Sequence, residues 1–416
     1  MTRAPWKPLT RIDVFYQDDG DPERVGGLVL DENTVTNFQY DLAWLNTTRE
    51  LSPQQLPCAL GRAVVAAPDK KKLHGLHGLF ADSLPDDWGW RVMDSAFRRH
   101  GITAHSLSVL DRLAYLGDRA MGALSYRPSL EWPAETEQVA TLDALAREAA
   151  TLDEGRSRPP GPSAIDQLER AAGTPGGAQP KVLYHSEGKH YLLKFTPERE
   201  RNRLRKDCGQ IEQAYARMAH DAGLDMPATR LFATTDARLH FAAERFDRTP
   251  SGGRRHVHTL GGLLGREASD NGDYDELLRV ARGLTGDART LDEVFRRLCF
   301  NVMLLNDDDH LKNVAFLLDP REGWQLAPAY DLTYSPSVRG ERGMSIVGRE
   351  GGVTWGDVDT LAATHGVKRE RLREMREAVE GSIRNWEQHA SDAQVPSDSI
   401  TELKSAFSER AKSLAL

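Results

Sequence analysis

The chain has 416 residues, too many for one small hydrophobic core, so two or three domains or lobes are expected. Hydrophobic residues make up 39% and charged residues 28%, as in ordinary globular proteins, and no apolar run reaches the length of a membrane-spanning helix. A formal net charge of −8 argues against a globally basic nucleic-acid-binding protein.

The cysteines and the N-terminus bear on the cell compartment. Cys58, Cys208 and Cys299 are far apart and form no CxxC or Cys–His pattern, which argues against disulfides and structural zinc. The first residues, MTRAPWKPLTRIDVFYQ, contain no apolar segment of the kind that a signal peptide has. We therefore expect a cytoplasmic protein that does not associate with a membrane.

The first third of the chain mixes strand and helix patterns. Aromatic and β-branched residues predict short strands over about residues 10–46, in LTRIDVFY, RVGGLVL and TVTNFQY. Pro85, followed by two aspartates, predicts the start of a helix whose body is RVMDSAFRR. Residues 153–178 are rich in Pro and Gly and predict a boundary or a mobile loop, interrupted by the short helix AIDQLERAA.

The middle of the chain predicts a small sheet with one helix. PKVLYH and KHYLLKF flank SEG and predict a β-hairpin over residues 180–195. The helix QIEQAYARMAHDAGL follows, and then a strand pair, ATRLFAT and RLHFAAERF. From about residue 255 the pattern is mostly helical, with apolar residues on one face of LDEVFRRLCFNVMLLN, and VAFLL and WQLAP predict a further hairpin.

This order of elements predicts an α+β, protein-kinase-like fold with two lobes. We place a small β-rich N-terminal subdomain at residues 1–135, a kinase-like N-lobe with a Gly-rich loop at residues 136–250, and an all-helical C-lobe at residues 251–416.

The stretch LLNDDDHLKN contains three consecutive aspartates. A calcium loop starting at Asp307 needs Gly at its sixth position and Glu at its twelfth, and the sequence has neither. A kinase catalytic loop has an Asp followed five residues later by a magnesium-binding Asn, and Asp308 and Asn313 have that spacing. Asp331, after the predicted hairpin, stands where a second magnesium ligand is expected.

Upstream residues fit the phosphate-binding part of the same scheme. GTPGGAQPK supplies glycines followed by Lys181, and YLLKF supplies Lys194, although a plain linker is the alternative for the loop. Glu212 is a candidate to orient a lysine, with an exposed helix position as the alternative. ERFDR, residues 244–248, falls where a hinge between lobes would bind adenine, or it forms a salt-bridged surface.

Together, GTPGGAQPK, YLLKF, ERFDR, LLNDDDHLKNVAFLL and LAPAYDLTYS resemble the HipA family of serine/threonine kinases, the toxin halves of toxin–antitoxin pairs. GGLVL, FQYDLAWL and LFADSLPDDWG resemble the small domain that precedes the kinase fold in that family. The resemblance covers about residues 10–390.

The resemblance implies a role for each matching residue. Asp308 is implied to be the catalytic base, and Asn313 and Asp331 to hold Mg²⁺. The residues implied to bind ATP are Gly176, Gly177, Lys181, Lys194, Glu244, Phe246 and His310. His310 follows the Asp, whereas the usual kinase order places His before it, and we weigh bracing of the loop above direct catalysis.

Family members shut themselves off by phosphorylating a serine of the Gly-rich loop, which ejects the loop. Thr174 occupies the matching position and is the implied autophosphorylation site. Threonine is stiffer at χ1 than serine, so autoinhibition is the point at which this chain departs from the family pattern.

The implied function is an ATP- and Mg²⁺-dependent serine/threonine protein kinase that arrests growth by phosphorylating a protein such as an aminoacyl-tRNA synthetase. The implied partners are a HipB-like helix-turn-helix antitoxin and, through it, operator DNA. Two alternatives stay open: a phosphotransferase acting on a small molecule, against which the N-terminal third argues, and a corepressor that mainly binds an antitoxin. In the corepressor, VKRERLR (residues 367–373) would contact phosphates, unless it is a solvated helix face.

Overall fold

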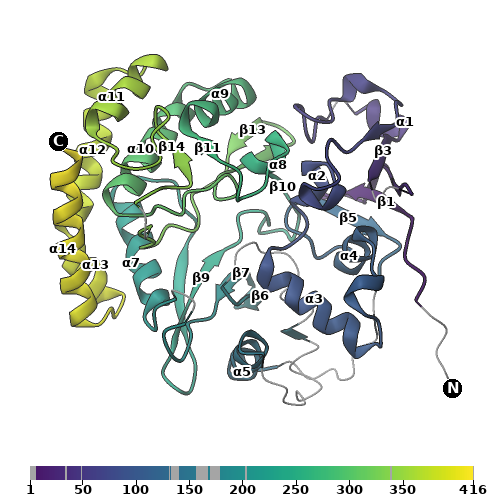
Figure 1. The fold of residues 1–416 in the computed structure, drawn as a ribbon, viewed down its shortest axis with the longest axis horizontal. Helices are drawn as coiled ribbons and strands as arrows, with labels where there is room; N and C mark the ends of the chain where they lie inside the picture. Colours follow the sequence, from purple (N-terminus) through teal and green to yellow (C-terminus); the bar gives the residue numbers. More distant parts are fainter. Residues whose placement is uncertain are drawn as a thin grey trace. The chain divides into compact units, whose positions relative to one another are not determined.

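A computed structural model describes residues 6–32, 35–47, 49–130, 132, 140–155, 167–168, 179–201, 204–337 and 340–415 (Figure 1). The chain forms two compact units, the first made of Met1–Phe195 with Arg245–Glu267 and the second of Thr196–Glu244 with Ala268–Leu416. Thr174, Gly176 and Gly177 lie outside the described residues, as does most of the predicted boundary segment 153–178. The domain boundaries at residues 135 and 250 stay predictions.

A five-stranded antiparallel sheet is the centre of the first unit. Its strand order is β4 (Val65–Ala66), β3 (Thr36–Tyr40), β2 (Glu23–Leu30), β1 (Arg11–Tyr16) and β5 (Leu124–Arg127). Ile12, Val14 and Tyr16 alternate along β1 and are buried, as the period of two residues in a strand requires. The strands predicted in LTRIDVFY, RVGGLVL and TVTNFQY are confirmed.

Helices complete the core of the first unit. They are α1 (Leu42–Leu45), α2 (Gly78–Ala81), α3 (Asp87–Arg99), α4 (Val109–Leu116), α5 (Leu142–Asp153) and α8 (Leu260–Leu264), which follows β10 (His256–Thr259). α3 begins two residues after Pro85, as predicted, and buries Trp88 and Phe97. α4 begins with a capping box, in which the side chains of Ser108 and Asp111 each accept a backbone N–H of the other.

The predicted hairpin of residues 180–195 is confirmed as β6 (Lys181–Ser186) and β7 (Lys189–Lys194), and we call residues 181–194 the lysine hairpin. Glu187 and Gly188 connect the strands with φ of 52° and 74°. Positive φ at both central residues is typical of the type I′ turn, whose twist matches that of the strands. The turn therefore fixes the register of the hairpin.

The second unit is mainly helical. α10 (Arg289–Met303) buries Val294, Phe295 and Leu298 on the apolar face predicted from the sequence. The rings of Tyr215 and Trp386 pack edge-on within one aromatic cluster. The other helices are α7 (Cys208–Asp221), α9 (Tyr274–Thr285), α11 (Trp355–Thr364), α12 (Arg369–Arg384), α13 (Trp386–Asp392) and α14 (Ser397–Leu414).

Short strand pairs accompany these helices. β8 (Thr229–Ala233) pairs with β9 (Leu239–Glu244), and β12 (Ala315–Asp319) pairs with β13 (Gly323–Leu326), both antiparallel and both predicted. β11 (Gly272–Asp273) and β14 (Met344–Ser345) form a short parallel pair. The second unit therefore combines helices with small strand pairs. The prediction that residues 251–416 form an all-helical C-lobe is corrected by β11 to β14, which lie in this range.

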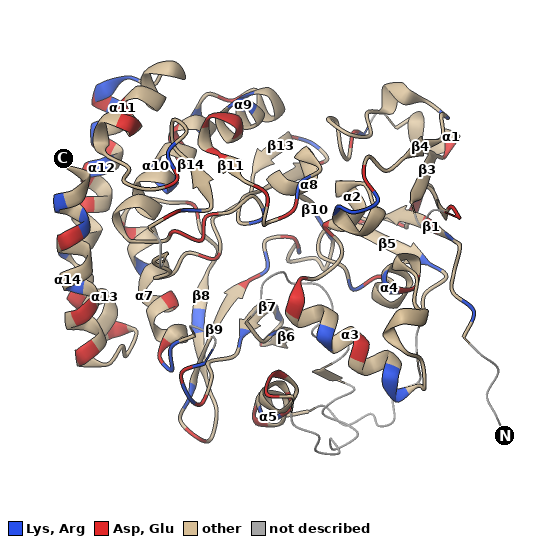
Figure 2. Cartoon of the chain, viewed as in Figure 1, with Lys and Arg blue, Asp and Glu red and all other residues tan. Residues whose placement is uncertain are grey.

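The charged face of α12 is solvated. Arg373 pairs with the exposed Glu377, and the half-buried Arg376 pairs with Glu380. Basic and acidic residues are interspersed over the helices (Figure 2). This favours the solvated-face interpretation of VKRERLR.

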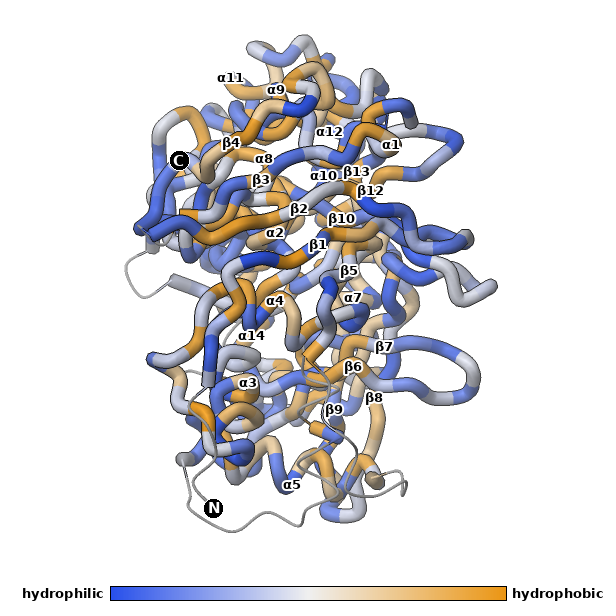
Figure 3. Tube along the Cα trace, turned by 90° about the vertical axis from the view of Figure 1, so that its right-hand side faces the viewer, coloured by the Kyte–Doolittle hydropathy of each residue, from blue (hydrophilic) through white to orange (hydrophobic). Residues whose placement is uncertain are grey.

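Hydrophobic and hydrophilic residues alternate over short distances along the trace (Figure 3). Among the described residues, no helix combines the length and the apolar character needed to cross a membrane.

Two buried histidines should make the first unit acid-sensitive. Burial lowers the pKa of His77 to about 4 and the pKa of His256 to about 3, from 6.5. Below pH 6.5 these histidines are protonated in the unfolded chain but stay neutral in the folded protein until the pH reaches their lowered pKa values. The free energy of unfolding therefore falls with falling pH by about 1.4 kcal/mol per pH unit for each histidine. We expect His77→Gln to weaken this pH dependence in urea unfolding between pH 5 and 7, whereas the exposed His220→Gln should not. If the free energy of unfolding depended equally on pH in the wild type and in His77→Gln, the buried His77 would not contribute to the acid sensitivity.

Candidate functional site

The triple aspartate lies in a loop directly after α10, which we call the Asp loop (residues 305–313). Leu305 enters the loop with a φ of 55°, and Asn306 forms an isolated bridge with Ser335. At the other end, the backbone N–H of Asn313 donates to the carbonyl of His310 at 2.8 Å, and the Asn313 side-chain amide donates to the carbonyl of Asp308 at 2.7 Å. The loop is thus closed on itself by the two residues whose spacing the sequence singled out.

Asp309, the last of the three aspartates, is buried behind the loop. Its Oδ2 accepts Tyr274 Oη at 2.6 Å and Arg342 Nη2 at 2.6 Å, and its Oδ1 accepts the backbone N–H groups of Gly343 at 3.1 Å and Met344 at 3.4 Å. Burial raises the pKa of Asp309, and the Arg342 guanidinium and the Tyr274 hydroxyl oppose that rise. Four donors on two oxygens is the pattern of an ionised carboxylate.

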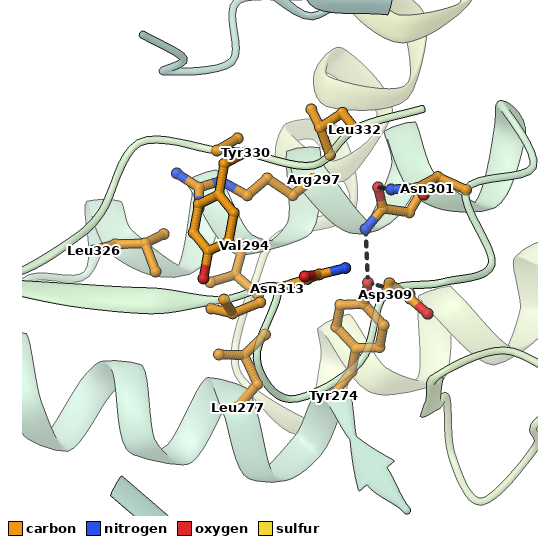
Figure 4. A pocket seen from close by; sticks show the side chains of 13 residues that line it. Tyr274, Leu277, Val294, Arg297, Asn301, Asp309, Asn313, Leu326, Tyr330 and Leu332 are labelled. Atoms are coloured by element: carbon orange, nitrogen blue, oxygen red, sulfur yellow. Dashed lines mark hydrogen bonds between the residues drawn. The ribbon is translucent and has the colours of Figure 1, made fainter. Parts of the chain in front are cut away.

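Tyr274 itself is oriented by a second hydrogen bond. Asn301 Nδ2 donates to Tyr274 Oη at 3.1 Å, so the tyrosine proton points to Asp309 (Figure 4). The Asn301 side-chain oxygen accepts Asn306 Nδ2 at 2.9 Å, which extends the chain of hydrogen bonds back to the start of the Asp loop. These side chains hold the loop from behind.

Asp307 is also buried. Its Oδ2 accepts the backbone N–H of Ser337 at 3.2 Å, and its Oδ1 lies 3.6 Å from Arg342 Nη1 and 3.7 Å from Arg410 Nη2. The backbone N–H of Gly343 donates to the Asp307 carbonyl at 2.8 Å. Asp307 and Asp309 therefore connect the Asp loop to Ser335, Ser337 and residues 342–344.

Asp308 is the exposed member of the three. The hydrogen bonds of Asp307 and Asp309 give these two neighbours a structural role in the loop. Because both neighbours are fixed inside the protein, the side chain between them is directed outward.

Asp331 follows β13 in a strained backbone conformation. Its φ of 59° is uncommon for a residue other than Gly, and such conformations cluster at functional sites. The preceding Tyr330 donates from Oη to the carbonyl of Lys312 at 2.6 Å, and Tyr330 and Asn313 line the same small hollow of about 20 Å³, with room for about one water (Figure 4). The segments that carry Asn313 and Asp331 are therefore held together.

The donors at this place suit magnesium. An Asn amide oxygen and an Asp carboxylate are hard oxygen ligands, and Mg²⁺ keeps several waters, so few protein ligands are enough. In the described part of the chain, no group of three or more His, Cys, Asp or Glu side chains is arranged to hold a metal.

His310 braces the Asp loop. Its Nδ1 accepts the backbone N–H of Lys312 at 3.2 Å. This hydrogen bond is compatible with the predicted bracing role, and the role of His310 stays a prediction.

The lysine hairpin of the first unit places two cations side by side. Lys181 and Lys194 are directly opposite each other on β6 and β7, with 3% and 5% of their surfaces exposed. The Phe195 N–H donates to the Pro180 carbonyl at 2.8 Å, so the next pair along, Lys181 with Lys194, belongs to the non-hydrogen-bonded class, in which side chains are closest. Like charges that are directly opposite each other on neighbouring strands repel.

The ERFDR segment crosses from one unit to the other. Glu244 ends β9 in the second unit, whereas Phe246 belongs to the first. Arg245 binds Asp247 through two hydrogen bonds, Nε to Oδ1 at 2.8 Å and Nη2 to Oδ2 at 2.7 Å, and Arg248 Nη1 adds a third at 2.7 Å.

Asp247 is a buried anion that sequence reasoning missed. Burial alone raises the pKa of this carboxyl, but the guanidinium groups of Arg245 and Arg248 outweigh that effect and hold the pKa of Asp247 well below its usual range. Arg245, Asp247 and Arg248 form a largely buried ion-pair cluster rather than the salt-bridged surface that was the alternative. The spacing of Arg245 and Asp247, two residues apart on an extended chain, was the available signal.

The candidate residues thus fall into two groups. Asp308, His310, Asn313, Asp331 and Glu244 belong to the second unit, as does Glu212, which is buried in α7 rather than exposed. Lys181, Lys194 and Phe246 belong to the first unit.

A fold with strand-rich and helical parts and an Asp–Asn loop after a long helix defines the class of protein-kinase-like proteins. Within that class, residues 12–127 match the HipA N-terminal domain and residues 173–386 match the HipA-like C-terminal domain. The chain therefore belongs to the HipA family, and the resemblance stated from its motifs is confirmed.

A solved structure shows the same fold. HipA of Shewanella oneidensis MR-1, solved in complex with HipB and operator DNA, is similar with a TM-score of 0.67 and 17% sequence identity over 95% of this chain and 96% of that chain. The predicted α+β, kinase-like fold with two lobes is confirmed by this likeness.

Curated relatives match parts of the chain. They are a Haemophilus influenzae protein named "Putative kinase", 28% identical over 38% of this chain, and the Sinorhizobium fredii "Putative kinase Y4dM", 33% identical over 32% of this chain. The Escherichia coli "Toxin YjjJ" is 26% identical over 40% of this chain. The chain spans 51%, 36% and 39% of the lengths of these three relatives.

Proposed function

We propose that this chain is an ATP- and Mg²⁺-dependent serine/threonine protein kinase of the HipA toxin type. The observation that carries the proposal is the Asp loop, in which Asp308 is exposed between two buried aspartates and hydrogen-bonded through its carbonyl to Asn313. Phosphoryl transfer asks a protein mainly for positioning and charge stabilisation, and an Asp and an Asn five residues apart supply the base and a magnesium ligand.

In the proposed mechanism each residue has one task. Asp308 accepts the proton of the attacking hydroxyl group through its carboxylate. Asn313 and Asp331 hold Mg²⁺, which supplies charge neutralisation at the phosphates when bound. Lys181 and Lys194 bind phosphate oxygens, and Glu244 and Phe246 are proposed to contact adenine.

The lysine pair provides the first test. Lys181→Ala and Lys194→Ala should each weaken ATP binding by roughly 10- to 100-fold, because a hydrogen bond to a charged group contributes about 1.5–3 kcal/mol. Isothermal titration with ATP and Mg²⁺ measures the dissociation constant. Lys189→Ala, an exposed lysine of the same hairpin, is the matched control. Unchanged affinity in both variants would contradict the assignment.

Autophosphorylation gives a second test. The chain incubated with ATP and Mg²⁺ should gain the mass of one phosphate, and Asp308→Ala and Thr174→Ala should gain none. A phosphate that persists in Thr174→Ala would move the modified residue elsewhere. An equal gain in Asp308→Ala would sink the assignment of the base.

We also propose a HipB-like helix-turn-helix antitoxin as partner, and operator DNA as an indirect one through it. The support is the likeness to Shewanella HipA, whose printed description is a complex with HipB and its operator DNA. The target, for which an aminoacyl-tRNA synthetase is a candidate, is proposed on the family resemblance alone. Co-purification of the chain with the product of a neighbouring reading frame of antitoxin size tests the partner, and absence of binding would reject it.

A further inference from the structure

A tryptophan of the N-terminal domain holds the backbone of the first hairpin lysine. Trp88, at the start of α3, is fully buried, and its indole Nε1 donates to the carbonyl of Lys181 at 2.9 Å. Both residues belong to the first unit. This hydrogen bond connects two residues that are 93 positions apart in the sequence, and it joins the domain matched at residues 12–127 to the lysine hairpin.

The position of this bond follows from strand geometry. In a non-hydrogen-bonded pair the carbonyl of Lys181 points away from β7, and among the described strands β6 lies at the edge of its sheet. A buried carbonyl there needs a donor from outside the sheet, and the Trp88 indole supplies it. Because Lys194 is paired with Lys181 across the hairpin, a hydrogen bond that fixes the backbone of Lys181 also positions Lys194.

The same domain holds β7 at a second place. The backbone N–H of Gly122 donates to Asp247 Oδ2 at 2.7 Å, and Asp247 in turn binds the Arg245 side chain. The backbone N–H of Arg245 donates to the carbonyl of His190 in β7 at 2.8 Å. Both strands of the lysine hairpin are thus connected to the N-terminal domain through hydrogen bonds.

We propose that the N-terminal domain positions the phosphate-binding lysines and that Trp88 is the positioning residue through which it does so. The inference rests on the proposed function, since it assigns Lys181 and Lys194 to the phosphates of a nucleotide. Trp88 touches no nucleotide in this account and acts through the backbone of Lys181. The N-terminal domain is then part of the nucleotide-binding machinery and more than a separate docking module.

The test separates the phosphate contribution from the nucleoside contribution to binding. Trp88→Phe removes the indole N–H and keeps most of the ring. The full chain with Mg²⁺ is titrated with ATP and, separately, with adenosine, and its thermal unfolding is followed. We expect Trp88→Phe to weaken ATP binding roughly three- to tenfold, the effect of one hydrogen bond, and to leave adenosine binding unchanged. Trp90→Phe, on the same helix and stacked on Arg112, should change neither affinity.

The outcomes distinguish this inference from the proposed function. Wild-type affinity of Trp88→Phe for ATP overturns the positioning role while the proposed function stands. Equal weakening of ATP and adenosine binding, or weakening that matches a loss of folded protein, overturns it as well, because it shows a purely structural role. Failure of the wild-type chain to bind ATP overturns the proposed function and the positioning role together.

Discussion

Replacing Asp308 with alanine should lower the rate of phosphoryl transfer by about 10²- to 10⁴-fold, the usual contribution of a general base. The free energy of unfolding should change little, because the Asp308 side chain is exposed and the loop is held by its two buried neighbours. Quantification of phosphorylated product over time, with urea unfolding in parallel, measures both effects.

Two controls separate the role of the Asp308 carboxylate from side-chain shape and from the loss of any surface charge. Asp308→Asn keeps the shape and removes the base, so it should be nearly as slow as Asp308→Ala. Asp359→Ala removes an exposed carboxylate from α11 and should leave the rate unchanged. Activity of Asp308→Asn close to that of the wild type would show that this carboxylate is not the base.

Replacing Arg342 with alanine should destabilise the second unit by about 3–5 kcal/mol, because removing one partner of a buried ion pair leaves a charge without compensation. Arg342 is buried, with Asp309 at 2.6 Å and Asp307 at 3.6 Å, so Asp309 loses its cation and Asp307 keeps only Arg410, at 3.7 Å. The Asp loop would lose one of its connections to residues 342–344 at the same time. Urea unfolding followed by circular dichroism measures the loss.

Removing both charges of the Arg342–Asp309 pair should destabilise the protein less than removing Arg342 alone. Arg342→Met combined with Asp309→Leu removes both charges and should recover much of the stability lost in Arg342→Ala. Arg373→Ala, which breaks an exposed ion pair of α12, should cost nothing measurable. If Arg342→Ala unfolds like the wild type, the ion pair does not hold the loop.

Much of the fold could be predicted because its strands and helices depend on residues that are close together in the sequence. The strand pattern of residues 10–46, the helix after Pro85 and the apolar face of α10 depend on periodicity and on capping, which neighbouring residues determine. The lysine pair was also within reach. A two-residue turn at Glu187 and Gly188 fixes the register, and counting back from it places Lys181 opposite Lys194.

The contacts that hold the Asp loop and the lysine hairpin could not be predicted, because they join residues that are far apart in the sequence. Arg342 meets Asp309 across 33 residues, and Trp88 meets Lys181 across 93, and neither leaves a periodic trace in the sequence. The return of residues 245–267 to the first unit is likewise a property of packing and not of local pattern. Spacing could select Asp308 among three aspartates, but only packing shows why its neighbours cannot replace it.

The central claim is that this chain transfers the γ-phosphate of ATP to a protein. The most direct measurement incubates the chain with heat-treated cell lysate, Mg²⁺ and ATP labelled at its γ-phosphate, and then separates proteins from small molecules. We predict a labelled protein with the wild type and none with Asp308→Ala. Label confined to small molecules, or the same labelled protein with Asp308→Ala, would contradict the account.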